Sequence, residues 1–301
     1  MRFAISIPQY ADADFDPSAF RSYMARAEEL GFESAWTSEQ VLGSAPLLGP
    51  IELMSYAAAI TERIRLGVSM LILPLYSPLH LAKSLSSVDQ LSRGRLDVGL
   101  GLGGRFRMFP AFGVDPSTLV ARFNESLDLI ETLWSEEKVD FEGRFWQLKD
   151  AQMEPKPWQK PRPPLWFGGA APPALRRAVK RGDGFFGAGS QTTQQFIDQV
   201  AVVRDAMQES GRADFKIAKR VYVTVDDDEA RARTRMGEAL EKLYGYFGIK
   251  VLDGAVVGSP ATCIRGLAEV RDAGAEMILL HPLVDELAQM ERLAAEVMPA
   301  L

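Results

Sequence analysis

Apolar positions along the chain follow two alternating periods, which predicts strands followed by helices. Residues 3–7 form a short apolar run typical of a strand, and the run stops at Pro8. Asp16 and Pro17 then cap and open a segment whose apolar residues recur at helical spacing up to Gly31. A second apolar run starts directly after this glycine. The first 40 residues therefore predict a strand, a helix and a strand.

The same organisation, a helix, a glycine and then a strand, recurs at Gly31, Gly94, Gly182 and Gly274. Together with the runs between them, it predicts eight strands, at residues 3–7, 34–38, 64–73, 95–101, 164–168, 184–188, 217–225 and 276–281. Eight strands alternating with helices in 301 residues favour one closed (β/α)8 TIM barrel over residues 1–301. An open Rossmann-type sheet is the alternative.

Two segments, at about residues 102–163 and 244–256, do not fit the repeat and are expected to be insertions. The first contains a helical pattern at 119–134, which we interpret as an inserted helix. It continues with VDFEGRFWQL, a predicted hairpin, and EPKPWQKPRPP, a predicted extended strap. Long loops on a barrel are often functional, so both segments are candidates for substrate contacts.

Composition narrows the possible partners. A net charge of -6 argues against nucleic acid and anionic membranes, which are bound by clustered Lys and Arg. No apolar stretch approaches the roughly 18 residues of a membrane helix, and no signal peptide is evident, so we expect a cytoplasmic protein. The single cysteine, Cys263, lies on the apolar face of the helix that Ser259 and Pro260 open, and is expected to be buried. The two histidines are far apart, so no metal site is expected.

Residues 166–191 contain two consecutive joints between a strand and a loop, made of small residues. Gly168, Gly169 and Ala170 end one strand and precede a helix opened by proline. Such a turn lets backbone N–H groups and a helix N-terminus approach a phosphate. The second joint consists of Gly187, Ala188, Gly189 and Ser190. A phosphate cradle and simple tight connections are both compatible with this pattern.

Polar residues at predicted strand ends supply the candidate chemistry, because barrel enzymes keep their active sites there. Glu39 and Gln40 close the second strand, and Glu39 is either a general acid or base or an ordinary surface carboxylate. His281 ends the last strand and is a candidate proton carrier, whereas His80 at a helix start is expected to be structural. The acidic run 226–229 is expected to be a solvated helix start.

The motif GLGLGG at residues 99–104 matches the dinucleotide fingerprint GxGxxG, but the match does not predict a dinucleotide site. No helix pattern follows it directly, and no acidic strand end lies about 20 residues on. We interpret it as a strand whose glycines let a planar ring lie against the backbone. Arg105 and Arg107 beyond it either meet an anionic group or are solvated.

Five segments together resemble the bacterial luciferase-like flavin and deazaflavin oxidoreductase superfamily, and more closely its branch that uses coenzyme F420. They are ARAEELGFESAWTSEQ (25–40), RIRLGVSMLILPLYSPLHLAKSLSSVDQLSRGRLDVGLGLG (63–103), VDFEGRFWQLKDAQMEPKPWQKPRPPLWFGGA (139–170), RRAVKRGDGFF (176–186) and VVGSPATCIRGLAEVRDAGAEMILLHP (256–282). The resemblance covers nearly the whole chain in the expected order.

The resemblance implies a barrel that binds a flavin-type ring at its strand ends, with a non-proline cis peptide at Ser69-Met70 behind the ring. The implied cofactor contacts are Gln9, Glu39, Ser69, Met70, Leu71, Gly103, Arg105, Gly168, Gly169, Ala170, Gly187, Ala188, Gly189 and Ser190. The implied activity is hydride transfer between coenzyme F420 and a small organic substrate, by a homodimer. The alternatives are an FMN-dependent monooxygenase and a non-catalytic flavin-binding protein.

One position departs from the pattern. Many members of the deazaflavin branch have His where this chain has Gln40, and Gln cannot act as a base. Either Glu39, or another group such as His281, carries the proton, or the reaction needs no proton transfer. The resemblance does not identify the substrate.

Overall fold

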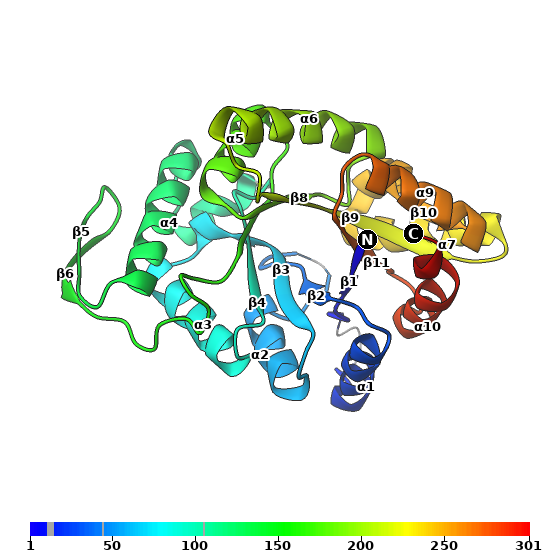
Figure 1. Cartoon of the computed structure of the whole chain (residues 1–301), viewed down its shortest axis with the longest axis horizontal. Helices are drawn as coiled ribbons and strands as arrows, with labels where there is room; N and C mark the ends of the chain where they lie inside the picture. The colour runs from blue at the N-terminus through cyan, green and yellow to red at the C-terminus, as the bar shows by residue number, and fades with distance from the viewer. Residues whose placement is uncertain (11–14, 44, 105) are drawn as a thin grey trace.

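Eight parallel strands close into a barrel in the computed structural model, which describes residues 1–10, 15–43, 45–104 and 106–301 (Figure 1). They are β1 (Arg2–Ser6), β2 (Ser34–Thr37), β3 (Arg65–Ile72), β4 (Leu96–Gly101), β7 (Leu165–Phe167), β8 (Gly184–Gly187), β9 (Lys216–Val225) and β11 (Met277–His281). Pairing of β8 with β9 and of β11 with β1 completes the ring. The predicted TIM barrel and its eight strands are confirmed, and the open sheet is excluded.

Helices surround the barrel on the outside (Figure 1). They are α1 (Pro17–Glu29), α2 (Pro50–Ile60), α3 (Pro78–Leu91), α4 (Leu119–Ser135), α5 (Pro172–Arg181), α6 (Thr193–Ser210), α7 (Glu229–Tyr244), α9 (Pro260–Asp272) and α10 (Glu286–Arg292). The predicted caps are confirmed: the Asp16 side chain accepts from the N–H groups of Ser18 and Ala19, and the Ser259 side chain accepts from Thr262 N–H. Asp228 caps α7 in the same way.

The segment 102–163 is only partly an insertion. We expected the helix at 119–134 to be inserted, but α4 packs on α3 and occupies a place in the ring of helices (Figure 1). The surplus length lies in β5 (Val139–Glu142) and β6 (Gln147–Ala151), which form the predicted hairpin, and in the strap that follows. Gln90 of α3 donates to Lys156 O at 2.8 Å, so the strap is bound along this helix.

The segment 244–256 forms short helical turns rather than an open loop: η4 (Gly245–Phe247), α8 (Gly248–Val251) and η5 (Leu252–Gly254). A further short strand, β10 (Val256–Gly258), pairs in parallel with β9 and was not predicted. Its run of three residues is too short to stand out in the sequence. The segment packs against α7, since a Cβ on Gly248 would lie 2.6 Å from Leu240 O.

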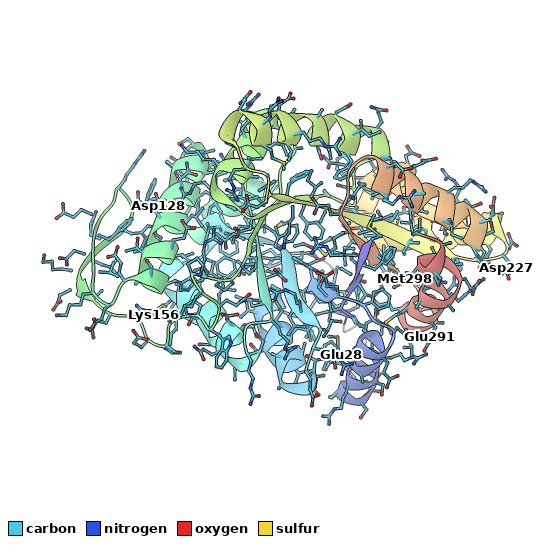
Figure 2. All side chains as sticks on the ribbon, in the orientation of Figure 1. Glu28, Asp128, Lys156, Asp227, Glu291 and Met298 are labelled. Carbon is cyan, nitrogen blue, oxygen red and sulfur yellow. The ribbon has the colours of Figure 1, made fainter. Side chains whose placement is uncertain are left out.

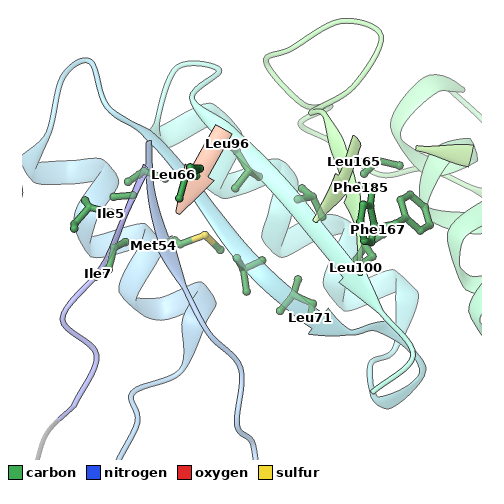
Figure 3. Packing of buried hydrophobic residues seen from close by; sticks show 14 of the residues in the cluster. Ile5, Ile7, Met54, Leu66, Leu71, Leu96, Leu100, Leu165, Phe167 and Phe185 are labelled. Carbon is green, nitrogen blue, oxygen red and sulfur yellow. The ribbon is translucent and has the colours of Figure 1, made fainter. Parts of the chain in front are cut away.

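The core has two layers. Leucine, isoleucine and phenylalanine side chains of the strands meet helix residues such as Met54 in the outer layer (Figure 3). Inside the barrel, Trp36, Trp166 and Phe186 pack edge to face, with ring centroids 4.8–6.0 Å apart. Cys263 is buried as expected.

Labelled charged side chains such as Glu28, Asp128 and Glu291 lie around the outer rim of the molecule, away from both layers (Figure 2). Within the described ranges, the structure contains no helix of the length and apolarity that a bilayer crossing requires.

Candidate active site

A cavity opens at the carboxyl ends of the barrel strands. Ser6 of β1, Trp36 of β2, Ser69 of β3, Arg220 of β9 and His281 of β11 all line it, and we call it the mouth cavity. Because these residues come from five strands, the cavity exists only in the closed barrel. Both segments expected to contact substrate also reach it, through Gly104, Met108 and Tyr244.

Glu39 lines the mouth cavity, but both of its carboxylate oxygens are engaged by β3 and the turn after it. Oε2 accepts from Ile72 N–H at 2.5 Å, and Oε1 accepts from the Tyr76 hydroxyl. Burial raises the pKa of Glu39, while these two hydrogen bonds act in the opposite direction. Glu39 thus ties the end of β2 to the end of β3.

Gln9 also lines the cavity, and its amide is fully used by backbone groups. Nε2 donates to Ser38 O at 2.6 Å and to Leu48 O at 2.7 Å, while Oε1 accepts from Ser38 N–H at 2.8 Å. These bonds fix the loops after β1 and β2 next to each other. Gln9 therefore shapes the wall of the cavity rather than offering free polar atoms.

Gln40 and His281 line the mouth cavity, and each has a buried polar atom without a hydrogen-bond partner among the described residues: Gln40 Oε1 and His281 Nδ1. Burial, followed by the charge of Arg220, lowers the pKa of His281 well below its usual value. The imidazole is therefore neutral at neutral pH. Buried polar atoms normally find partners, so these two are suited to a ligand with polar groups.

Arg220 and Tyr222 were not identified from the sequence, although both lie in the predicted seventh strand. Arg220 donates to the carbonyl and the hydroxyl of Ser69 across the barrel. The Tyr222 and Tyr244 hydroxyls lie 2.6 Å apart, and Tyr222 packs on the His281 ring. The available signal was the pair of cations, Lys219 and Arg220, inside a mostly apolar strand, because buried charges are rare without a partner or a function.

The Ser69–Met70 peptide is cis, as the resemblance implies. Ser69 faces the mouth cavity, whereas Met70 packs on the aromatic cluster inside the barrel. Leu71 is fully buried in the outer core. Gly103 has a φ of 74° and lies against Ile72.

The two small-residue loops lie beside the mouth cavity rather than in its wall. A Cβ on Gly168 would be 2.9 Å from Met70 Cγ, and one on Gly189 would be 3.0 Å from Arg220 Cδ. Ala170 lines a separate groove between α5 and α6. Among the described residues that line the mouth cavity, there is no contribution from Gly169, Gly187, Ala188 or Ser190. Arg105 and the Arg107 side chain lie outside the described part of the chain.

Lys219 holds the loop at residues 187–190 in place. It lies on the face of β9 opposite to Arg220. Its side chain is fully buried, and Nζ donates to Ala188 O at 3.1 Å and to Gln191 O at 2.8 Å. Burial lowers the pKa of Lys219 to about 8. The loop carbonyls thus point at the lysine, which leaves the loop N–H groups to other partners.

The cavity meets the requirements of a flavin-type ring. Gln40 Oε1 and His281 Nδ1 need polar partners, and Arg220 has no carboxylate partner among the described residues. A ring edge that carries both N–H and C=O groups would satisfy these atoms. The glycines at 99, 101 and 168 let the Met70 side chain pack closely against the backbone of their strands and the loop after β7.

The fold and site define a barrel protein with a ligand cavity at the strand ends, and comparison with known proteins identifies its family. A family model described as luciferase-like monooxygenase matches residues 1–254. The chain belongs to this family, and the resemblance seen in the sequence is confirmed at that level.

Relatives within the family differ in cofactor. An F420-dependent glucose-6-phosphate dehydrogenase of Beutenbergia cavernae is 31% identical, covering 72% of this chain and 67% of that protein. The oxygenase component of a flavin-dependent trigonelline monooxygenase of Acinetobacter baylyi is 27% identical, covering 74% of this chain and 62% of that protein. A monooxygenase structure from Streptomyces bottropensis has a TM-score of 0.83 at 27% identity, covering 99% of both chains. The relatives thus include F420-dependent and flavin-dependent enzymes.

Proposed function

We propose that the protein is an oxidoreductase that transfers a hydride between coenzyme F420 and a small organic substrate. The observation that carries this proposal is the pair of unpartnered buried atoms, Gln40 Oε1 and His281 Nδ1, in the mouth cavity beside Ser69. Similarity to F420-dependent dehydrogenases supports the choice of cofactor. The homodimer expected from the resemblance stays a prediction.

The residues that would hold the ring are Ser69 and Arg220 on one side, with Gln40 and His281 as polar partners. When bound, the cofactor supplies a ring carbon that accepts or donates a hydride. The protein supplies orientation and a surrounding from which water is largely excluded. Glu39 is placed to keep this surrounding rigid, since it fixes Ile72 N–H and the Tyr76 hydroxyl.

Titration of the purified protein with each cofactor tests the proposal. We expect micromolar or tighter binding of coenzyme F420, followed by its reduction when an electron donor is added. Glucose 6-phosphate and a panel of small alcohols are suitable first donors. Binding of FMN without binding of F420 would contradict the proposal.

The second candidate is an FMN-dependent monooxygenase, favoured by the similarity to the Streptomyces monooxygenase over the whole of both chains. In such an enzyme the shielded mouth cavity would protect reduced flavin from water while oxygen reacts. Oxygen consumption that requires reduced FMN and a substrate would identify it. A non-catalytic flavin-binding protein would bind the cofactor and turn over none of the donors.

Gly169→Asp tests whether the first small-residue loop meets the cofactor phosphate. A carboxylate there would repel the phosphate and take the space of an N–H contact, so we expect F420 affinity to fall at least about tenfold. Gly169→Ala is the matched control, because a Cβ at this position already lies 2.9 Å from Ala174 Cβ. Equal F420 affinities of the two variants would show that this loop does not contact the cofactor phosphate.

Glu39→Gln tests whether Glu39 holds the cavity in shape. Glutamine offers one acceptor oxygen where the carboxylate offers two, so when Ile72 N–H keeps that oxygen the Tyr76 hydroxyl loses its charged acceptor and can only accept from the amide N–H. We expect a loss of about 1–3 kcal/mol of stability and weaker F420 binding, measured by urea denaturation and titration. Tyr76→Phe removes only one of the two bonds and should cost less. A Glu39→Gln variant that equals the wild type in both assays would refute this role.

A further inference from the structure

Glu286, the first residue of α10, lies in the wall between two cavities. It lines the mouth cavity, and it also lines a second cavity between α1, the end of the loop after β1 and the start of α10. We call the second one the outer cavity. Tyr10 is the other residue that lines both.

The Glu286 carboxylate has neither a hydrogen bond nor an ion pair within the described ranges. Its neighbour Asp285 is exposed and paired with Arg235 at 2.7 Å, so the two adjacent acids differ completely in surroundings. A carboxylate without hydrogen-bond partners, half-buried in a wall between cavities, has only the N-terminal dipole of α10 to stabilise its charge. Surface helix starts usually place such a group in water instead.

Other groups in the mouth cavity are poorly suited to take up a proton at neutral pH. Gln40 has no ionisable group, and both Glu39 oxygens accept hydrogen bonds. His281 is neutral, because its pKa lies well below the usual range. The hydroxyls of Tyr222 and Tyr244 bond to each other, and burial raises the pKa of Tyr244 well above its usual value.

We propose that Glu286 is the proton acceptor of the mouth cavity, which takes the proton of a substrate hydroxyl and returns it to solvent through the outer cavity. The inference rests on the proposed hydride transfer. When an alcohol is oxidised, its C–H bond breaks and the hydride leaves with both electrons to the oxidised cofactor. The O–H bond breaks as the carbonyl forms, and the proton goes to the carboxylate.

The electrostatic surroundings agree with this role. Burial raises the pKa of Glu286 to about 7, so acid and carboxylate forms coexist near neutral pH. The titratable and charged groups that share a cavity with it among the described residues are Tyr10 after β1, Asp16 and Tyr23 at α1, Glu39 after β2, Arg220 and Tyr222 of β9, Tyr244 of α7, His281 of β11 and Asp285 beside it. Of these, Tyr23 is buried and donates to Ser6 O at 3.0 Å, so it does not compete for the proton.

The test compares Glu286→Gln, Glu286→Ala and the control Asp285→Asn. Asp285 has a φ of 47°, a conformation that asparagine tolerates, so the control preserves the backbone. Infrared difference spectra of the protein without cofactor, between about pH 5 and about pH 9, should show a carboxylic acid that ionises near 7. The band should be lost in both Glu286 variants and kept in Asp285→Asn. A wild-type spectrum without this ionisation would overturn the proposal.

The second measurement follows F420 reduction by the most active alcohol of the panel. We expect the wild-type rate to rise with pH through about 7, and Glu286→Gln to be at least about a hundredfold slower and flat over this range. Formate should partly restore Glu286→Ala, because a small carboxylate can enter through the outer cavity. A Glu286→Gln variant with the wild-type rate and pH profile would overturn the proposal. Failure to bind F420 at all would instead contradict the proposed function. The infrared result could still be interpreted in that case, because it is obtained without cofactor.

Discussion

Replacing Gly99 with alanine is expected to disrupt the barrel at the mouth cavity. A Cβ at this position would lie 2.0 Å from Val68 O and 2.7 Å from Met70 Sδ. The backbone oxygen cannot move away, because β3 and β4 are paired on both sides of this point. We expect a loss of at least about 3 kcal/mol, or no folded protein, since overpacking against backbone exceeds the usual cost of an added methyl group.

Gly101→Ala is the matched control in the same strand. Its Cβ would meet nothing closer than Met70 Cβ at 3.4 Å, which is an ordinary contact. Urea denaturation of the two variants, with the midpoint and slope compared, measures the difference. Equal midpoints would show that the strands can separate at Gly99, contrary to the packing described above.

The barrel could be predicted from the sequence because each strand is buried on both faces. Such strands appear as short continuous apolar runs, and glycine marks the step from each helix to the next strand in several repeats. The status of α4 could not be predicted in the same way. Length alone made 102–163 look inserted, and only the contact of α4 with α3 shows that the hairpin and strap hold the surplus.

The candidate site was predictable where it depends on strand ends, and much less so where it depends on closure of the barrel. Glu39 and Gln40 directly follow a predicted strand, His281 ends another, and all three line the mouth cavity. Arg220 meets Ser69 across 151 residues of sequence, a contact that no local pattern encodes. Glu286 follows the last strand by a few residues, but its value as a candidate comes from two cavities that the sequence does not reveal.

Lys219 and Arg220 illustrate why register matters. The two cations are adjacent in β9, so strand alternation places them on opposite faces. Lys219 points toward α6, where its ammonium lies 5.3 Å from the centroid of the Phe196 ring, and Arg220 points into the mouth cavity. The sequence predicts that one of them faces the barrel interior. Which one it is depends on how β9 pairs with β8 and β11, and those pairings are set by the whole ring.

Glu286→Gln should make the protein more stable above neutral pH, although it removes the proposed proton acceptor. The pKa of Glu286 is raised from 4.5 to about 7 in the folded protein, so the folded state binds a proton more tightly than the unfolded chain. The favourable contribution of the neutral Glu286 acid to the free energy of unfolding is complete below about pH 4.5 and is lost as the pH rises through about 7. Glutamine mimics the neutral acid at every pH, and so escapes this loss.

The expected gain at about pH 8 is about 2–3 kcal/mol, because each pKa unit corresponds to about 1.4 kcal/mol and partial exposure of the side chain reduces the full value. At about pH 4.5 the variant and the wild type should agree. Urea denaturation at both pH values measures the difference, with Asp285→Asn as the exposed control whose stability difference should not vary in this way. A Glu286→Gln variant that gains nothing between the two pH values would show that the carboxylate is well solvated in the folded protein. In that case the Glu286 carboxylate would not destabilise the folded protein. A measured gain would instead mean that an ionisable carboxylate is kept between the two cavities although it lowers the free energy of unfolding, as expected for a group retained for its chemistry.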